Sequence, residues 1–408
     1  MKKTLLKKYA NLLVTKGINV QKGQSVFITA DVEQYKFVTL LVDAAYKSGA
    51  DLVAVDWTYQ SLTILNYRHR SLKSLSQLTP WAKAKYEYMS EKFPCRISLL
   101  SDDPDGLNNI NFDKLTKTQR AVMPQIKPYR DKIENKHQWL VAAVPGEAWA
   151  KKLFPNERKS VAVEKLWQAI LKTCHVTEDN DPVAEWDKAN ALSTSRCEKL
   201  NEQQFEYLTY KSSNGTDLKV GLMPESRWFG GLSKTLGGIE YNPNMPTEEV
   251  FTSPKKGIAE GRLVSTMPLS HNGRLVENFE FTFKNGKVVS YKAEKGEDVL
   301  KELLDMDEGA SYLGEVALVP KESPIKETGI LFYNTLFDEN ASCHFALGKG
   351  YSDTIEGFES MTEEDFKKLG LNESVIHVDF MVGTDDLVIK GHKGNKEFTV
   401  FENGTWAF

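Results

Sequence analysis

The sequence has 408 residues, with 52 lysines and arginines against 56 aspartates and glutamates and a formal net charge of −4. This near balance argues against nucleic acid as the main partner, because a surface that binds nucleic acid needs a basic excess. No segment is long and apolar enough to cross a bilayer, so a membrane partner is not expected. A chain of this length usually exceeds a single hydrophobic core, and we therefore expect two domains.

The 4 cysteines are widely separated and form no Cys-x-x-Cys pair. This spacing excludes a thiolate zinc module and gives no reason to expect a disulfide framework. We expect most of them to be small core residues.

The N-terminus starts with lysines, as a secretory signal does, but Lys7 and Lys8 interrupt it before an apolar segment develops. Its apolar residues recur with helical spacing, at Leu5, Leu6, Tyr9, Leu12 and Leu13. The segment therefore predicts an amphipathic helix, and we expect a cytoplasmic protein.

The first half of the chain alternates short apolar runs with helical patterns. Strands are expected at 24–29, 51–56, 96–100 and 138–144. Helices are expected at 32–48, 71–92 with a break near Pro80, 112–134, 148–153, 161–173 and 181–200. This alternation predicts an α/β N-terminal domain with a mostly parallel sheet.

An acidic segment, Ser101–Asp105, follows one of these expected strands. The ends of parallel strands are common ligand sites, so its carboxylates are candidates for contact with a cation or a metal. An exposed turn with a helix cap is the alternative that turn-residue preferences favour. No glycine-rich phosphate motif follows the first strand, so a nucleotide has no support from the sequence.

The pattern changes near residue 205, where short alternating runs replace the long helices. Asn-Gly pairs separate these runs at Asn214-Gly215, Asn272-Gly273 and Asn285-Gly286. Asn-Gly between alternating runs is a strong hairpin signal. We therefore predict an α/β domain over 1–205 and a β-rich α+β domain over 206–408.

Candidate metal ligands are concentrated in the second half. His377 and Asp379 are two residues apart in an apolar run, and side chains at i and i+2 of a strand share a face. His344 precedes a glycine-rich turn that ends on Tyr351. Each signal alone is weak, because a histidine in an apolar run is often a core residue and His-x-Asp occurs by chance.

Two carboxylates complete the set of candidates. Glu249 follows Glu248 in a segment bracketed by prolines, which disfavour helix, and a solvated acidic turn is the simpler interpretation of it. Glu315 begins an apolar strand, where it either caps the strand edge or needs a cation to compensate its burial. Nitrogen and oxygen donors together suit Zn²⁺, Co²⁺ or Mn²⁺.

Five segments of the chain resemble one known family of enzymes. They are Val144–Lys151 (Val-Pro-Gly-Glu-Ala-Trp-Ala-Lys), Asn244–Pro254 (Asn-Met-Pro-Thr-Glu-Glu-Val-Phe-Thr-Ser-Pro), Tyr312–Val319 (Tyr-Leu-Gly-Glu-Val-Ala-Leu-Val), Phe337–Tyr351 and His377–Gly383. Together they are similar to the thermophilic aminopeptidases of peptidase family M29, over the whole chain.

The resemblance implies a metallo-aminopeptidase with two divalent metal ions in each subunit. The metal positions of the family fall on Glu249, Glu315, His344, His377 and Asp379, and its active-site tyrosine falls on Tyr351. It also implies peptide substrates with a free N-terminus and a homodimer.

The sequence leaves some catalytic roles open. Tyr351 is a candidate hydrogen-bond donor to the tetrahedral oxyanion, or simply a tyrosine packed at the end of a loop. The general base is either Glu248 or one of the ligand carboxylates. The metal, the bridging ligand and the preferred N-terminal residue are not predicted.

Two other functions compete with this interpretation. One is a metal-dependent amidase or esterase that uses the same ions. The other is an α/β binding protein in which the histidines and glutamates are structural. Dependence on a free amine separates the first from an aminopeptidase, and metal content separates the second.

Overall fold

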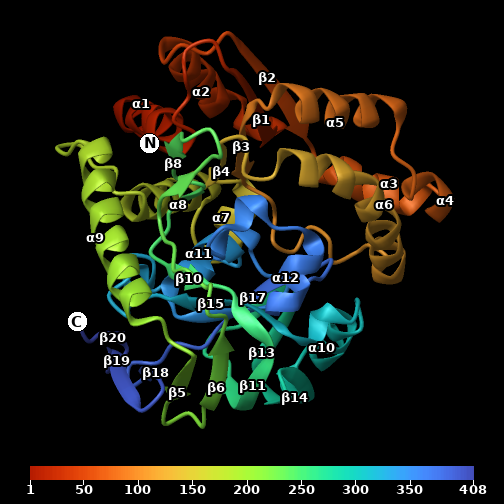
Figure 1. The fold of residues 1–408 in the computed structure, drawn as a ribbon. Helices are drawn as coiled ribbons and strands as arrows, with labels where there is room; N and C mark the ends of the chain where they lie inside the picture. The colour runs from red at the N-terminus through yellow and green to blue at the C-terminus, as the bar shows by residue number, and fades with distance from the viewer. The chain divides into compact units, whose positions relative to one another are not determined.

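The computed structural model describes residues 1–408 (Figure 1). The chain forms two compact units. Unit 1 comprises Met1–Asp187 and Leu232–Pro246, and unit 2 comprises Lys188–Gly231 and Thr247–Phe408. Compactness groups 188–205 with unit 2, whereas the sequence analysis assigns these residues to the first domain. The two domains 1–205 and 206–408 stay a prediction, because a domain is defined by independent folding as well as by compactness.

Unit 1 contains a five-stranded parallel sheet with the order β2-β1-β3-β4-β9. Its strands are β1 (Ser25–Asp31), β2 (Leu52–Thr58), β3 (Cys95–Leu100), β4 (Trp139–Ala143) and β9 (Asn244–Met245). Its helices are α1 (Lys3–Leu12), α2 (Tyr35–Lys47), α3 (Gln60–His69), α4 (Leu72–Leu75), α5 (Pro80–Lys92), α6 (Phe112–Ile133), α7 (Glu147–Leu153) and α8 (Lys159–Thr173). A two-stranded ribbon, β7 (Ser233–Lys234) with β8 (Glu240–Tyr241), completes the unit.

An aromatic cluster joins the helices of unit 1 to its sheet. The ring of Tyr9 in α1 lies 5.5 Å from Phe37 in α2 and 6.3 Å from Trp167 in α8. The Tyr9 hydroxyl donates to the Ala143 carbonyl at the end of β4, 3.0 Å away. This bond satisfies the polar end of a fully buried tyrosine, as burial requires.

Unit 2 is built from two antiparallel sheets. The smaller has the order β10-β15-β16-β17, with β10 (Val250–Thr252), β15 (Leu313–Leu318), β16 (His344–Gly348) and β17 (His377–Met381). The larger has nine strands: β5 (Tyr207–Lys211), β6 (Asp217–Leu222), β11 (Pro254–Val264), β12 (Leu269–His271), β13 (Arg274–Lys284), β14 (Lys287–Lys295), β18 (Val388–Lys393), β19 (Lys396–Glu402) and β20 (Thr405–Trp406). Its helices are α9 (Pro182–Gln203, shared with unit 1), α10 (Glu297–Leu304), α11 (Thr335–Asp338) and α12 (Glu363–Leu369).

Aromatic side chains from the two sheets make the core of unit 2. Phe380 of β17 lies 5.1 Å from Phe281 and 6.0 Å from Phe279, both on β13. Phe345 of β16 lies 5.0 Å from Tyr210 of β5. One face of the smaller sheet is thus committed to the hydrophobic core, which leaves its other face for polar groups.

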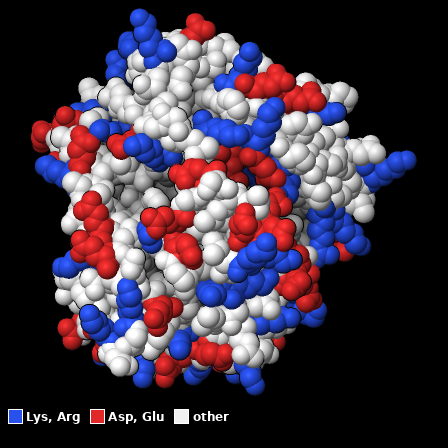
Figure 2. Space-filling view, viewed as in Figure 1, with Lys and Arg blue, Asp and Glu red and all other residues white.

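The fold class predicted from the sequence is confirmed: an α/β unit with a parallel sheet precedes a β-rich unit. Helix α3 was not expected, and its leucines explain why, since Leu62 and Leu65 are exposed and give the sequence no buried stripe. No helix of the chain combines the length and the apolar character needed to cross a membrane. Acidic and basic side chains are interspersed on the face shown in Figure 2, as expected from their near-equal numbers.

Candidate metal centre

The register of the smaller sheet of unit 2 places four of the predicted ligands on one face. Ala346 of β16 is opposite both Glu315 of β15 and Asp379 of β17. Residues directly opposite in an antiparallel pair share a face, so the two carboxylates flank a small alanine. Two residues away on the same face lie His344 and His377.

The residues opposite the two histidines on the neighbouring strands are small, which leaves room for the imidazole rings. His344 is opposite Ala317, and His377 is opposite Gly348. The alternate residues of the same strands are apolar and belong to the buried core: Val316, Leu318, Phe345, Leu347, Val378 and Phe380. A shift of one residue in the strand register would turn the ligand side chains toward the hydrophobic core. The hydrophobic pattern therefore fixes the position of the site.

Three groups of side chains could each hold an ion, with their ligand atoms within 4.8 Å of one another. The groups are Glu249 with Glu315 and His344, Glu315 with His377 and Asp379, and Glu339 with His344 and Asp379. The structure therefore brings together all five side chains that the sequence analysis assigned to metal. It adds Glu339, which was not predicted.

Glu249 reaches the site from the segment before β10, which Asn340 holds in place. The backbone N–H of Glu248 donates to Asn340 Oδ1 over 2.7 Å. Asn340 is fully buried, and its Nδ2 donates to the Leu336 carbonyl and to Glu339 Oε1, at 3.0 and 3.3 Å. One amide side chain thus positions both Glu249 and Glu339.

Glu339 begins a short 3-10 turn, Glu339–Ala341, directly after α11. Glu339 is not part of a strand, so the alternating pattern that relates the other ligands on the sheet does not include it. The only signal in the sequence is its place inside the segment Phe337–Tyr351, which the family resemblance already singled out. Periodicity alone would not have found it.

Backbone carbonyls orient both histidines. His344 Nδ1 lies 3.1 Å from the Ser342 carbonyl, and His377 Nδ1 lies 2.7 Å from the Lys349 carbonyl. A carbonyl only accepts, so each Nδ1 carries the proton and each Nε2 is turned toward the carboxylates. Such a carbonyl–histidine arrangement is usual behind metal ligands.

The carboxylates lie close to these Nε2 atoms. His344 Nε2 is 3.3 Å from Glu249 Oε2, and His377 Nε2 is 3.1 Å from Glu315 Oε2 and 3.3 Å from Asp379 Oδ1. His344 Nε2 and Asp379 Oδ1 are buried and make no hydrogen bond. Two buried polar atoms without hydrogen-bond partners are costly in a protein interior. A bound cation would satisfy both, because each has a lone pair that can coordinate a metal.

The local field accounts for the protonation of the site. Burial lowers the pKa of His344, but Glu249, Glu315 and Asp379 outweigh it and raise the value to about 9. Burial raises the pKa of Glu315 to about 7 despite its bond to His377. Burial and then the neighbouring carboxylates raise the pKa of Glu339 well above its ordinary value.

The pKa of Asp379 moves in the opposite direction. Burial raises it, but the positive charge of His377, whose Nε2 is 3.3 Å from Asp379 Oδ1, dominates and holds the pKa at about 2. The site thus holds four carboxyl groups and two imidazoles. Such an excess of oxygen donors, with two nitrogens, fits divalent cations of the zinc, cobalt or manganese type.

Tyr351 stands beside this cluster. Its hydroxyl lies 3.1 Å from His377 Nε2, and the two rings are 4.8 Å apart. Ser253 holds its backbone, because Tyr351 N donates to Ser253 Oγ at 2.8 Å. Burial of the hydroxyl, and then the charge of Glu315 and its neighbours, raises the pKa of Tyr351 well above 10, so the phenol keeps its proton.

Two other predicted candidates lie outside the centre. Glu248, named as an alternative general base, belongs to none of the three groups. The acidic segment Ser101–Asp105 belongs to unit 1, where Asp103 and Asp105 lie in a turn that follows β3. Asp105 there pairs with Lys152 at 2.7 Å, so this carboxylate has a partner within its own unit.

Comparison with known proteins agrees with this arrangement. A family model described as thermophilic metalloprotease (M29) matches residues 2–406. The site and this match define a metalloprotease, a hydrolase of peptide bonds. The chain belongs to family M29, as its sequence segments predicted, and the expectation of a metallo-enzyme of that family is confirmed.

Several characterised relatives are similar over almost their whole length. Aminopeptidase AmpS of Bacillus subtilis is 42% identical over 99% of this chain and 98% of its own length. Aminopeptidase T of Thermus thermophilus is 38% identical, over 98% of each chain. The solved structure of wild-type AmpT from Thermus thermophilus superposes with a TM-score of 0.91 at 37% identity and covers both chains completely.

A more distant solved structure shares the fold alone. The 2,5-dihydroxypyridine dioxygenase of Pseudomonas putida KT2440 is 12% identical, with a TM-score of 0.51, over 99% of this chain and 96% of its own. A fold therefore does not by itself assign the reaction, and the side chains of the site must do so.

Proposed function

We propose that this chain is an aminopeptidase that releases amino acids from the free N-terminus of peptides with the help of two divalent metal ions. The ligands proposed are Glu249, Glu315, His344, His377 and Asp379. The observation that carries the proposal is the overlap of the ligand groups, since Glu315 belongs both to the group with His344 and to the group with His377. Among the five proposed ligands, Glu315 is the residue that would serve both ions.

When bound, two such ions lower the pKa of a water molecule and polarise the scissile carbonyl. The Tyr351 phenol, which keeps its proton, donates a hydrogen bond to the oxygen on which negative charge develops. We assign Glu339 as the general base, because its carboxylate lies beside His344 and Asp379 in the site. Bound cations would favour its ionised form, so that it could take a proton from water and pass it to the departing amine. The excess of carboxylates also suits the α-ammonium group of a peptide.

The oligomeric state and the metal also belong to the proposal. We propose a homodimer and zinc, cobalt or manganese as the ions. Light scattering of the purified protein measures its oligomeric state. Elemental analysis of protein prepared without added metal identifies the ions.

The first test is hydrolysis of leucyl-arylamide by protein stripped with a chelator and then supplied with Zn²⁺, Co²⁺ or Mn²⁺. We expect activity to disappear on stripping and to return with metal. Glu315→Gln should lose both activity and about half or more of the bound metal, because a shared ligand serves both ions. Activity that persists in protein shown to be free of metal would overturn the proposal.

Two further variants separate the assigned roles. Glu339→Gln should keep the metal content of the native protein and lose about 10²–10⁴-fold in kcat, as expected for a general base. Glu248→Gln is the matched control and should change kcat little. Loss of metal from Glu339→Gln would instead make Glu339 a ligand.

The substrate panel tests the class of reaction. An aminopeptidase requires the free amine, so N-acetyl-leucyl-arylamide and leucine esters blocked at nitrogen should not be cleaved. Equal cleavage of blocked and free substrates would favour a metal-dependent amidase or esterase.

A further inference from the structure

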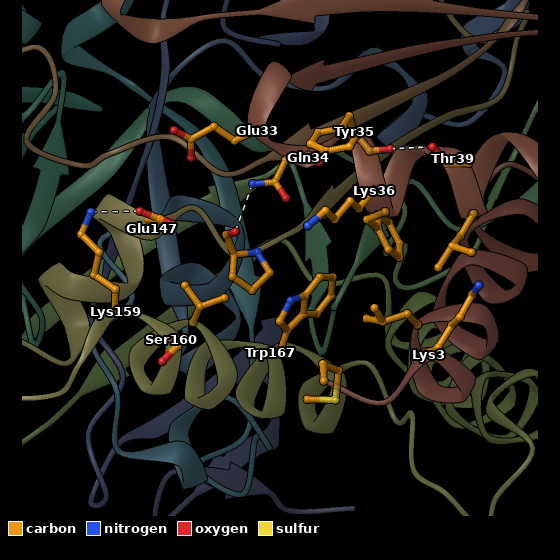
Figure 3. Close-up of a pocket in the computed structure, with 16 residues that line it drawn as sticks. Lys3, Glu33, Gln34, Tyr35, Lys36, Thr39, Glu147, Lys159, Ser160 and Trp167 are labelled. Atoms are coloured by element: carbon orange, nitrogen blue, oxygen red, sulfur yellow. Dashed lines mark hydrogen bonds and ion pairs between the residues drawn. The ribbon is translucent and has the colours of Figure 1, made fainter.

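Unit 1 contains a cavity of about 1200 Å³ that has no part in the metal centre. It lies where α2 and α8 begin, and its walls come from α1, α2, α7, α8 and the segment before α7 (Figure 3). Pockets for small molecules commonly measure about 300–1,000 Å³, so this cavity has ample room for one.

Part of the cavity lining is apolar. Leu6, Phe37, Leu40, Pro145, Val163 and Trp167 all line it. The indole of Trp167 is 8% exposed and packs its ring 5.5 Å from that of Phe37. An aromatic or branched hydrocarbon body would find a complementary surface there.

Two buried polar side chains face the same space without complete hydrogen bonding. The Nε1–H of Trp167 has no acceptor in the protein, although buried tryptophans usually find one. Gln34 is 7% exposed and donates its Nε2 proton to the Pro145 carbonyl at 3.0 Å, which leaves its Oε1 without a donor. Figure 3 shows both side chains turned toward the cavity.

The charges around the cavity favour an anion. Glu147 is paired with Lys159 at 3.1 Å, whereas Lys36 and Lys3 have no carboxylate partner. Figure 3 shows the Lys36 ammonium pointing into the cavity beside Gln34 and above Trp167, with Glu33 on the side of the Lys159–Glu147 pair. The unpaired lysine and the unpartnered indole N–H thus face the same cavity.

One helix N-terminus adds to this positive potential. Helix α8 has 15 residues and no side-chain cap, and its first residues, Lys159 and Ser160, line the cavity. Helix α2 continues a 3-10 turn, Val32–Gln34, that Asp31 caps, so its own first turn is not a free N-terminus. The positive end of a helix dipole stabilises an anion placed beside its first turn.

From these features we propose that the cavity is a binding site for a small amphipathic carboxylate. Its apolar body packs against Trp167 and Phe37, and its carboxylate accepts hydrogen bonds from Lys36 Nζ and Trp167 Nε1. This site is independent of the peptidase function, because every residue that forms it belongs to unit 1 and none is a proposed metal ligand.

The test uses 4-phenylbutyrate as the probe and isothermal titration as the measurement. The protein is used with its metal bound, and Glu315→Gln is measured alongside to show whether the carboxylate binds at the metal centre instead. We expect saturable binding with a Kd of about 0.1–1 mM. The uncharged 4-phenylbutan-1-ol and the cationic 4-phenylbutylamine should bind at least about tenfold more weakly, since they lack the carboxylate.

Variants assign the binding to this cavity. Lys36→Ala should weaken it about tenfold, and Trp167→Phe, which keeps a ring but loses the N–H, about threefold to tenfold. Val163→Phe should block the cavity and abolish binding. Lys22→Ala, an exposed lysine of the same unit outside the cavity, is the matched control and should bind as the native protein does.

Thermal melting of every variant confirms that it is folded, and Val163→Phe gives an independent answer if Trp167→Phe is unstable. Absence of saturable binding, equal affinity for the amine, or native affinity in both Lys36→Ala and Val163→Phe would each overturn the proposal. Binding that is lost in Glu315→Gln would place the probe at the metal centre and overturn it as well.

Discussion

The Tyr351 hydroxyl lies 3.1 Å from His377 Nε2, beside the proposed ligands. If it stabilises the developing oxyanion, Tyr351→Phe should lower kcat about 10²–10³-fold and leave KM and the metal content nearly unchanged. Steady-state kinetics and elemental analysis measure these quantities. A tyrosine that only packs at the end of its loop would show native kcat after this substitution.

The burial of the cysteines leads to a prediction about their reactivity. All four, Cys95, Cys174, Cys197 and Cys343, are buried and free, as expected from the sequence. Burial raises the pKa of each thiol to about 12, so the reactive thiolate is scarce at neutral pH. We expect no reaction with a thiol reagent in the native protein within minutes and reaction of all four after unfolding. Rapid labelling of the folded protein would contradict the prediction that the buried thiols are unreactive.

Individual site residues could be predicted from the sequence where they follow the periodicity of a strand. His377 and Asp379 were recognisable because strand spacing puts them on one face. Glu339 was not, since it sits on an irregular turn whose position depends on Asn340 and on packing far along the chain. Ligands that come from loops carry no periodic signal, and only the resemblance to a family pointed to that segment.

At the scale of elements, Gly348 fixes the separation of β16 and β17 beside the metal centre. Its φ is +107°, and a Cβ there would lie 2.1 Å from the Ile376 carbonyl oxygen. Gly348→Ala should destabilise the protein by about 2–4 kcal/mol and displace His377, so bound metal should fall too. Gly357→Ala is the control, because its φ is +75° but its Cβ would meet only the end of Met361 at 4.0 Å.

We expect Gly357→Ala to cost about 1 kcal/mol, from its backbone alone, and to keep its metal. Urea unfolding and elemental analysis compare the two variants. Equal destabilisation by both would mean that β16 moves to accommodate the new methyl group without disturbing the site.

A second prediction at this scale concerns acid and the hairpin of β12 and β13. Burial, and then the charge of Arg274, lowers the pKa of His271 to about 4. The unfolded chain takes up a proton below its ordinary pKa of about 6.5, whereas the folded chain does not, so stability is present above that pH and is lost as pH falls toward 4. We expect a loss of about 1–2 kcal/mol, discounted because the ring is partly exposed.

His271→Gln should remove this part of the acid sensitivity. Urea unfolding of both proteins at pH 7, 6, 5 and 4 measures it. Parallel stability curves over this range would show that the histidine titrates normally in the folded state.

Regular helices and strands could be predicted from the sequence better than the way in which distant segments pair. Strands and helices with a buried stripe or face, such as β1 and α8, were predicted within a few residues. The return of Leu232–Pro246 to unit 1 was not, because the strand involved, β9, is only two residues long and leaves no alternating pattern. Pairing between β4 and β9 joins residues about a hundred positions apart, and nothing local in the chain specifies it.

At the scale of the whole molecule, removal of metal should affect the two units unequally. Glu249, Glu315, Glu339 and Asp379 all belong to unit 2, and without cations their mutual repulsion is offset only by two imidazoles and by the uptake of protons. Bound ions stabilise the folded state by mass action, so a chelator should lower the melting temperature by about 10 °C. Hydrogen exchange then locates the effect: amides of β15, β16 and β17 should exchange faster, while those of β1, β3 and β4 in unit 1 should keep their rates. A uniform acceleration in both sheets would show that the two units unfold as one, and unchanged exchange in β15–β17 would mean that the carboxylates are held without ions.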